Sequence, residues 1–308
     1  MVVILAYVCL MYADYVVVSW LILRHLTDNL WGAVHAVIFN ICIFMAFFAH
    51  ARCMLTDPGI IPRPENAKDK PSCQSEVPQP DSSDCPSTAA ATLAVSPSPQ
   101  PEGTDSHYAY SGIYLGAYPR PRGSLDPDTI KAMTICQRCD MYRPPRAHHC
   151  RTCQGCVRKM DHHCPWINNC VGAFNQKYFL QFLVWVSITS LYAGSIALFS
   201  WLADCPGCRS EPEATRHMAL MHTVILAVES CLFGGFTLVM ILDQMSAILK
   251  DETGIESLKR TGAFRPHTSR RLLLREACGP GTPLCWIFPC QSLNHQPIEE
   301  TKMITTLV

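Results

Sequence analysis

The sequence predicts an all-α integral membrane protein with four transmembrane helices and a cytosolic cysteine-rich domain. Three observations predict this fold class: four long apolar blocks, a one-sided distribution of Lys and Arg, and a short segment dense in Cys and His. The 308 residues carry a formal net charge of zero, so we expect no nucleic-acid partner.

Each apolar block is long enough to cross a bilayer. The blocks hold about 20 residues or more without Lys or Arg, and a helix of ~20 residues spans the ~30 Å hydrocarbon core. Core helices of a soluble protein are the alternative, but such helices usually carry a polar stripe, which these blocks lack. The first block has no basic n-region, so we expect it to be retained and not cleaved as a signal peptide. The blocks are Val2–Leu23, Leu30–Ala49, Tyr178–Leu202 and Met218–Leu242.

The distribution of Lys and Arg predicts the topology. Four spans place both termini on the same side as the loop 50–177. This loop carries 14 Lys and Arg and the tail 243–308 carries 8, whereas the two segments on the other side carry 3. Because cytosolic segments carry the excess of positive charge, we expect the loop and both termini in the cytosol.

The spans divide the chain into five parts. The loop from 65 to 128 is rich in Pro, Ser and Ala, has almost no periodic apolar pattern, and is expected to be largely disordered. The parts are two spans in 1–49, a cytosolic loop 50–130, a cysteine-rich domain 131–177, two further spans in 178–242, and a cytosolic tail 243–308.

Two sets of metal-ligand residues interleave in the cysteine-rich domain. Each set has the spacing Cys-x2-Cys-x9-His-x6-Cys, and the second is offset from the first by 14 residues. Three Cys and one His complete a tetrahedral zinc shell with no open position, so we predict a domain stabilised by two structural Zn²⁺ ions. The first set is Cys136, Cys139, His149 and Cys156; the second is Cys150, Cys153, His163 and Cys170.

The repeat leaves one cysteine over. Cys164 lies where a third unit would begin, but that unit has no ligand residues at its later positions. His162 and Asp161 also lie outside the two shells; an imidazole can take a thiol proton, and a carboxylate can orient the imidazole. The three residues therefore form either a catalytic group or a structural cluster, since neighbours in sequence need not touch.

The stretch "DHHCPWINNCVG", the preceding "RPPRAHHCRTC", the "DPG" at 57–59 and the four spans resemble the DHHC-family protein S-acyltransferases, or palmitoyltransferases. "LTDPG", "NNCVG" with "NQKYF", and "DETGIE" are similar to the Golgi-resident subgroup, which implies a multi-pass protein of the Golgi membrane. One departure is the tail motif, Thr-Thr-x-Glu in the family, which here reads Thr253-Gly254-Ile255-Glu256.

The resemblance implies two-step chemistry. Cys164 would take a palmitoyl group from palmitoyl-CoA and pass it to membrane-proximal cysteines of substrate proteins, with His162 as base and Asp161 as its orienter. Arg143 and Arg146 would meet the CoA phosphates, although a solvated charge is the alternative for each. Two further positions are implied in acyl binding: Trp166 at the mouth of the acyl cavity and Thr189 as a limit on chain length, whose modest side chain should admit more than sixteen carbons.

Other predictions concern smaller features. Asp14, Asn40 and Glu229 fall near the middle of predicted spans and are expected to form a polar cluster between helices. The C-terminal Thr306-Leu307-Val308 fits a PDZ-domain ligand.

Two other classes of protein fit parts of the sequence. A non-catalytic zinc scaffold would not require the spare Cys164 and its neighbours. A RING-type ubiquitin ligase closes its metal sites with a final CxxC pair, whereas here the last ligand, Cys170, stands alone.

Overall fold

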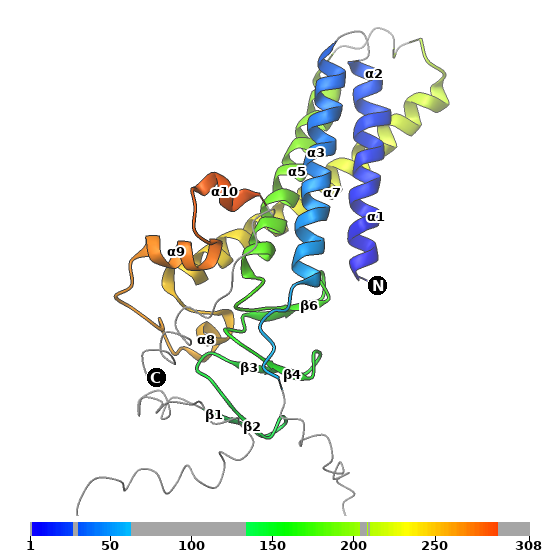
Figure 1. The fold of residues 1–308 in the computed structure, drawn as a ribbon. Coiled ribbons are helices and arrows are strands. Elements are labelled where there is room, and N and C mark those ends of the chain that lie inside the picture. Colours follow the sequence, from blue (N-terminus) through cyan, green and yellow to red (C-terminus); the bar gives the residue numbers. More distant parts are fainter. Residues whose placement is uncertain (1, 27–29, 63–133, 204–207, 209, 289–308) are drawn as a thin grey trace, which may run out of the picture.

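The computed structural model describes residues 2–26, 30–62, 134–203, 208 and 210–288. The predicted disordered segment 65–128 and the predicted PDZ ligand at the C-terminus lie outside the described residues. Figure 1 shows a bundle of long helices with the cysteine-rich segment at one end, the end at which α1 also begins.

Four helical segments are long and apolar enough to span a membrane, which confirms the prediction of four transmembrane helices. They are Val2–His25, which comprises α1 (Val2–Tyr15), η1 (Val16–Ile22) and α2 (Leu23–His25), then α3 (Leu30–Leu55), α5 (Gln176–Leu202) and α7 (Glu213–Lys250).

Two of these helices continue well beyond the apolar blocks that predicted them. The helix α3 runs on to Leu55, and α7 runs on to Lys250, so each has a basic residue, Arg52 or Lys250, in its last turn. Hydropathy marks only the part that a bilayer covers, whereas a helix ends where its backbone is capped. The cap of α7 is Asp251, in the left-handed conformation at φ 50°.

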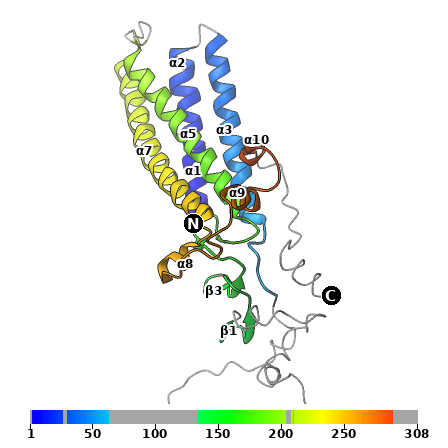
Figure 2. The same ribbon diagram turned by 90° about the vertical axis from the view of Figure 1, so that its left-hand side faces the viewer.

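The helix α5 lies at the centre of the bundle, between α3 and α7 (Figures 1 and 2). In the apolar stretch of α5, 56% is buried, whereas in that of α7 only 11% is buried, so α5 contributes most to the core. Ser187 of α5 and Thr237 of α7 share a buried hydrogen bond of 2.7 Å. These helices therefore combine apolar packing with polar contacts between small side chains, as in other membrane bundles.

The predicted polar cluster in the membrane does not form as one group, and the prediction is wrong for Asn40. This side chain is exposed and donates to the carbonyl of Ala36, 2.9 Å away on its own helix. Because the Asn40 amide already has a hydrogen-bond acceptor four residues earlier on its own helix, it needs no partner from another helix. Glu229 and Cys9 of α1 instead line a common cavity between the helices.

The cysteine-rich segment consists of three β-hairpins of three-residue strands, which the sequence did not predict. All three antiparallel pairs have the same register, shifted by 14 residues: Cys136 faces Met141, Cys150 faces Gly155 and Cys164 faces Asn169. The metal-ligand repeat is therefore also a structural repeat. The pairs are β1 (Thr134–Cys136) with β2 (Met141–Arg143), β3 (His148–Cys150) with β4 (Gly155–Val157), and β5 (His162–Cys164) with β6 (Asn169–Val171).

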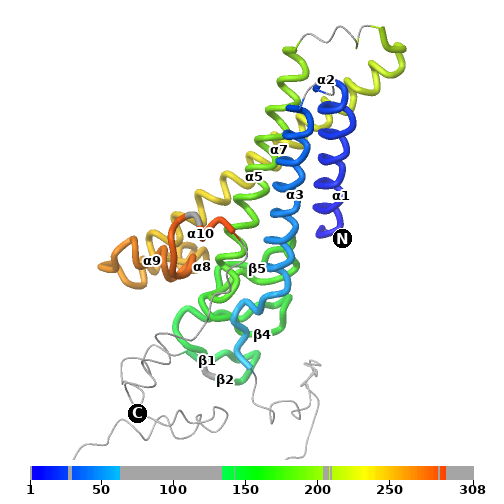
Figure 3. Tube along the Cα trace, turned by 45° about the horizontal axis from the view of Figure 1, so that its top comes forward, coloured from blue at the N-terminus to red at the C-terminus, as the bar shows by residue number. Residues whose placement is uncertain are grey.

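The segment after α7 lies near the end of the bundle that carries the cysteine-rich segment. It forms α8 (Gly254–Lys259), α9 (Arg270–Cys278) and α10 (Pro283–Ile287). Figure 3 shows α9 and α10 beside the lower halves of α5 and α7. Trp185 of α5 donates to the carbonyl of Ile287 at 2.9 Å, which fixes α10 against the bundle.

Candidate active site and metal centres

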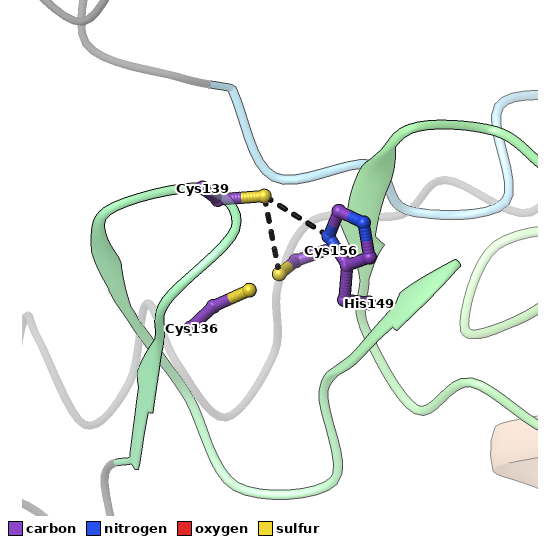
Figure 4. Close-up of side chains that lie close together, drawn as sticks. All are labelled: Cys136, Cys139, His149 and Cys156. Carbon is purple, nitrogen blue, oxygen red and sulfur yellow. Dashed lines mark hydrogen bonds between the residues drawn. The ribbon is translucent and has the colours of Figure 1, made fainter. Parts of the chain in front are cut away.

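The first predicted ligand set converges in space. Figure 4 shows Cys136, Cys139, His149 and Cys156 facing a common centre, and their donor atoms all lie within 4.8 Å of one another. The Cys139 sulfur is 3.1 Å from His149 Nδ1 and 3.8 Å from the Cys156 sulfur. A zinc tetrahedron with Zn–S bonds of ~2.3 Å has sulfur–sulfur edges of about 3.8 Å, so these residues fit Zn²⁺.

The second set has the same arrangement. His163 Nδ1 lies 3.4 Å from the Cys153 sulfur and 3.6 Å from the sulfurs of Cys150 and Cys170. Each set draws two Cys from one hairpin and a His and a Cys from the next. The two clusters could thus hold metal ions that join the three hairpins in series, and both shells are closed by protein ligands.

Cys164 occupies the repeat position of Cys136 and Cys150 but belongs to neither cluster. Where the first two units have Cys139 and Cys153, the third has Ile167, which is fully buried and apolar. The Cys164 side chain is 6% exposed and lines a cavity among the helices.

Three donors converge on the carboxylate of Asp161. Its Oδ2 accepts from His162 Nδ1 at 2.7 Å and from Gln244 Nε2 at 2.9 Å, and its Oδ1 accepts from the backbone N–H of Gly254 at 2.6 Å. The bond to Nδ1 leaves Nε2 of His162 for the thiol. The structure therefore joins Asp161 to His162 and places His162 and Cys164 two positions apart on one strand, so that both side chains are on the same face.

The electrostatics of this group favour an ion pair. Burial would raise the pKa of Asp161, but the hydrogen bonds from His162, Gly254 and Gln244 lower it below its ordinary value. Burial would lower the pKa of His162, but hydrogen bonds with Asp161 and Cys164 raise it to about 9. An imidazolium held at neutral pH beside Cys164 can give its proton to a departing thiolate, and the neutral ring can then take one from an incoming thiol.

The cavity beside Cys164 runs between α1, α3, α5 and α7. It has a free volume of about 850 Å³, counting the part that opens to the outside. Both predicted acyl-binding residues, Trp166 and Thr189, line it together with Cys164. Thr189 is 2% exposed and donates its hydroxyl to the carbonyl of Trp185, so it presents little polarity to the cavity.

A buried histidine that the sequence did not single out supports Trp166. His50 of α3 contacts the Trp166 carbonyl through Nε2 at 3.0 Å and the Tyr7 hydroxyl through Nδ1 at 2.9 Å. Only a proton on Nε2 satisfies the carbonyl, so Nδ1 accepts from Tyr7. The only signal in the sequence was a histidine at the end of an apolar run.

The two predicted CoA-binding arginines have different surroundings. Arg146 donates to Glu256 at 2.8 and 2.9 Å and to Asp251 at 2.7 Å, and its side chain is 9% exposed. Two carboxylates thus neutralise it, which favours a structural role over phosphate binding. Arg143 donates to the Thr134 hydroxyl at 2.7 Å in an exposed contact.

These features define a class of protein. Its members are embedded in a membrane and have a buried Cys–His–Asp group, an apolar cavity and two closed Cys/His clusters. The sequence model of the DHHC palmitoyltransferase family matches residues 129–261. The chain is 30% identical over 292 residues to palmitoyltransferase ZDHHC3-A of Danio rerio, covering 92% of this chain and 74% of that protein. It is 29% identical to palmitoyltransferase ZDHHC3 of Homo sapiens, with 91% and 76% covered, and 29% identical to palmitoyltransferase ZDHHC7 of Rattus norvegicus, with 93% and 76% covered.

The chain belongs to the DHHC palmitoyltransferase family. It is accordingly an integral membrane enzyme of the protein S-palmitoyltransferase class, as the sequence predicted.

Proposed function

We propose that Cys164 carries the acyl group between an acyl-CoA donor, palmitoyl-CoA in the first instance, and cysteines of protein substrates close to the membrane. The observation that carries this proposal is the position of Cys164. It is next to an Asp-held imidazole and at the wall of an apolar cavity, while the eight other Cys and His of the repeat close two metal shells.

In the first half-reaction the Cys164 thiolate attacks the thioester carbonyl of the donor. The sulfur–carbon bond to CoA breaks, and His162 gives its proton to the departing CoA thiolate. In the second half-reaction His162 takes the proton of the substrate thiol, which attacks the acyl-enzyme and releases Cys164. Asp161 stays ionised throughout and holds the His162 ring in place through the Nδ1 bond.

The metal ions would have only a structural role. Three sulfurs and one nitrogen per site suit Zn²⁺, and a closed shell offers no position for water or substrate. The second set, which includes His163 and Cys170, fixes the hairpin that carries Cys164. Its assembly therefore determines where the nucleophile lies relative to the helices.

The donor would bind across the membrane surface. We place the acyl chain in the cavity, with Trp166 near its mouth and Thr189 further along its wall. The CoA phosphates would remain on the polar side, where Arg143 is the better candidate contact because the charge of Arg146 is already neutralised.

The same arrangement supports a multi-pass topology with the hairpins and both termini in the cytosol. The start of α1, the hairpins and α8 lie at one end of the bundle, and α9 and α10 lie beside the same half of it (Figure 1). We propose the domain division given by the sequence, a Golgi membrane location from the resemblance, and a PDZ-domain partner for Thr306-Leu307-Val308.

The test is incubation of the purified protein with labelled palmitoyl-CoA. We expect hydroxylamine-labile label on the native protein and none on Cys164→Ser, with two zinc ions per chain in both. Cys156→Ala is the matched variant, because it should lose a zinc ion from the first cluster. Absence of label on the native protein would favour the scaffold class, and loss of zinc from Cys164→Ser would refute the ligand assignment.

A further inference from the structure

The cavity beside Cys164 changes in chemistry along its length. Near the thiol its walls are the aromatic rings of Phe179 and Phe182, whereas its far end includes Ala193, Ser230 and Glu229. Among the described residues that line this cavity, Glu229 has the only carboxyl group. A carboxyl at the end of an otherwise apolar cavity is costly and needs an explanation.

Contacts between α5 and α7 show how far the Glu229 carboxyl lies from Cys164 along the cavity. A side chain at Gly194 of α5 would meet Ser230 at 3.6 Å, so Glu229 lies about level with Gly194. Cys164 packs in one cluster with Phe179 of α5. From Phe179 the helix rises about 15 Å to Thr189 and about 22 Å to Gly194, at ~1.5 Å per residue.

These depths bracket the length of a palmitoyl chain. An extended acyl chain advances about 1.3 Å per carbon, given C–C bonds of about 1.5 Å, so sixteen carbons span about 20 Å and twenty span about 25 Å. The methyl end of a palmitoyl group would pass Thr189 and stop short of Glu229. A twenty-carbon chain would press against the carboxyl.

A second helix contributes to the same cavity wall. Cys9 of α1 lines the cavity together with Glu229 of α7. A methyl end pressed against the Glu229 carboxyl would leave that polar group in contact with hydrocarbon, which is costly. The hydroxyl of Thr189 donates to its own helix and imposes no such penalty.

We propose that Glu229 is the polar end stop of the acyl cavity and sets the upper limit of acyl-chain length. This inference rests on the proposed function, in which the cavity receives the acyl chain of the Cys164 thioester.

The experiment measures thioester formation at Cys164 with acyl-CoA donors of 14 to 22 carbons, using the purified full-length protein. For Glu229→Met we expect the ratio of twenty-carbon to sixteen-carbon labelling to rise at least about fourfold, the effect of one methylene gaining an apolar environment. Glu229→Gln keeps a polar group and should retain the native ratio. Thr223→Val is the matched control, a polar residue of α7 outside this cavity that donates to Ala219.

Donors with a terminal hydroxyl test the native protein directly, in case Glu229→Met does not fold. We expect the hydroxyl to improve a twenty-carbon donor, where it reaches Glu229, and to give no gain at sixteen carbons. Normal thioester yield with an unchanged ratio in Glu229→Met, or no gain from the hydroxyl at any length, overturns the inference alone. No thioester from any donor on the native protein overturns the proposed function, and this inference with it.

Discussion

Replacing Arg146 with Met separates a structural role from a role in CoA binding. The Arg146 guanidinium contacts Glu256 and Asp251, and the side chains of the three are 9%, 11% and 2% exposed. Removing one partner of a buried ion pair typically costs about 3–5 kcal/mol, because the opposite charge is left uncompensated. At about 2–4 °C per kcal/mol, the melting temperature should fall by about 6–20 °C.

The same change should impair chemistry without weakening donor binding. Glu256 caps α8 through Thr253, and Gly254 of that turn donates to Asp161. Loosening the turn therefore loosens the carboxylate that orients His162. We expect kcat to fall while the KM for palmitoyl-CoA stays within about twofold, as for an interaction that does not bind the ground state.

Arg143→Met is the matched control, since Arg143 lies in the same segment and makes an exposed contact. It should change stability by less than about 0.5 kcal/mol. Combining Arg146→Met with Glu256→Gln should cost less than the sum of the single changes, because it removes both charges of the pair. A raised KM for palmitoyl-CoA with an unchanged melting temperature in Arg146→Met would refute the structural assignment.

Three further outcomes are expected. In Gly172→Ala the new Cβ would clash with the carbonyl oxygen of Pro58, so we expect the free energy of unfolding in denaturant to fall by about 1–3 kcal/mol; an unchanged midpoint would contradict the close approach. Thr189→Phe should shift thioester formation toward donors shorter than sixteen carbons, and an unchanged donor profile would count against Thr189 as a wall of the acyl site. The pKa of His162 is about 9, above its ordinary 6.5, so the stabilisation from its bond with Asp161 is complete below about pH 6.5 and is lost as the pH rises through about 9. The melting temperatures of native protein and Asp161→Asn should therefore differ most near neutral pH and converge toward pH 10, and a gap that is constant with pH would contradict this assignment.

Local spacing predicted much of the fold and the composition of the site. The four spans follow from runs of apolar residues, and the eight metal-ligand positions follow from a repeat of 14 residues. Both are properties of short windows of sequence. The same repeat singled out Cys164. Eight Cys and His complete two shells of four ligands each, so Cys164, the ninth residue of the pattern, belongs to neither shell.

Contacts between distant segments lay beyond such reasoning. Gln244 and Gly254 hold Asp161 from 83 and 93 positions away, and His50 supports Trp166 from 116 positions away. No local pattern relates such positions, since only the packing of α3, α5 and α7 brings them together. The hairpins were also missed, because strands of three residues are too short for an alternating pattern to emerge.

Two histidines at equivalent positions of the repeat differ in a way that bears on the role of Asp161. His148 and His162 occupy the same position in successive hairpins, facing Val157 and Val171 respectively. Burial and the nearby positive charges of Lys259 and Arg143 lower the pKa of His148 to about 4, whereas the pKa of His162 is raised to about 9. Hydrogen bonds with Asp161 and Cys164 accompany the rise.

The residues that precede the two histidines also differ, in agreement with the difference between the two pKa values. Asp161 precedes His162, and Ala147 precedes His148. The bond to the Asp161 carboxylate thus favours the charged form of His162, whereas burial and two positive charges act against the charged form of His148. The first two units each begin with a metal-ligand cysteine, whereas the third has no later ligands and places Cys164 beside an imidazole that is bonded to Asp161. This is the arrangement that the proposed acyl transfer uses.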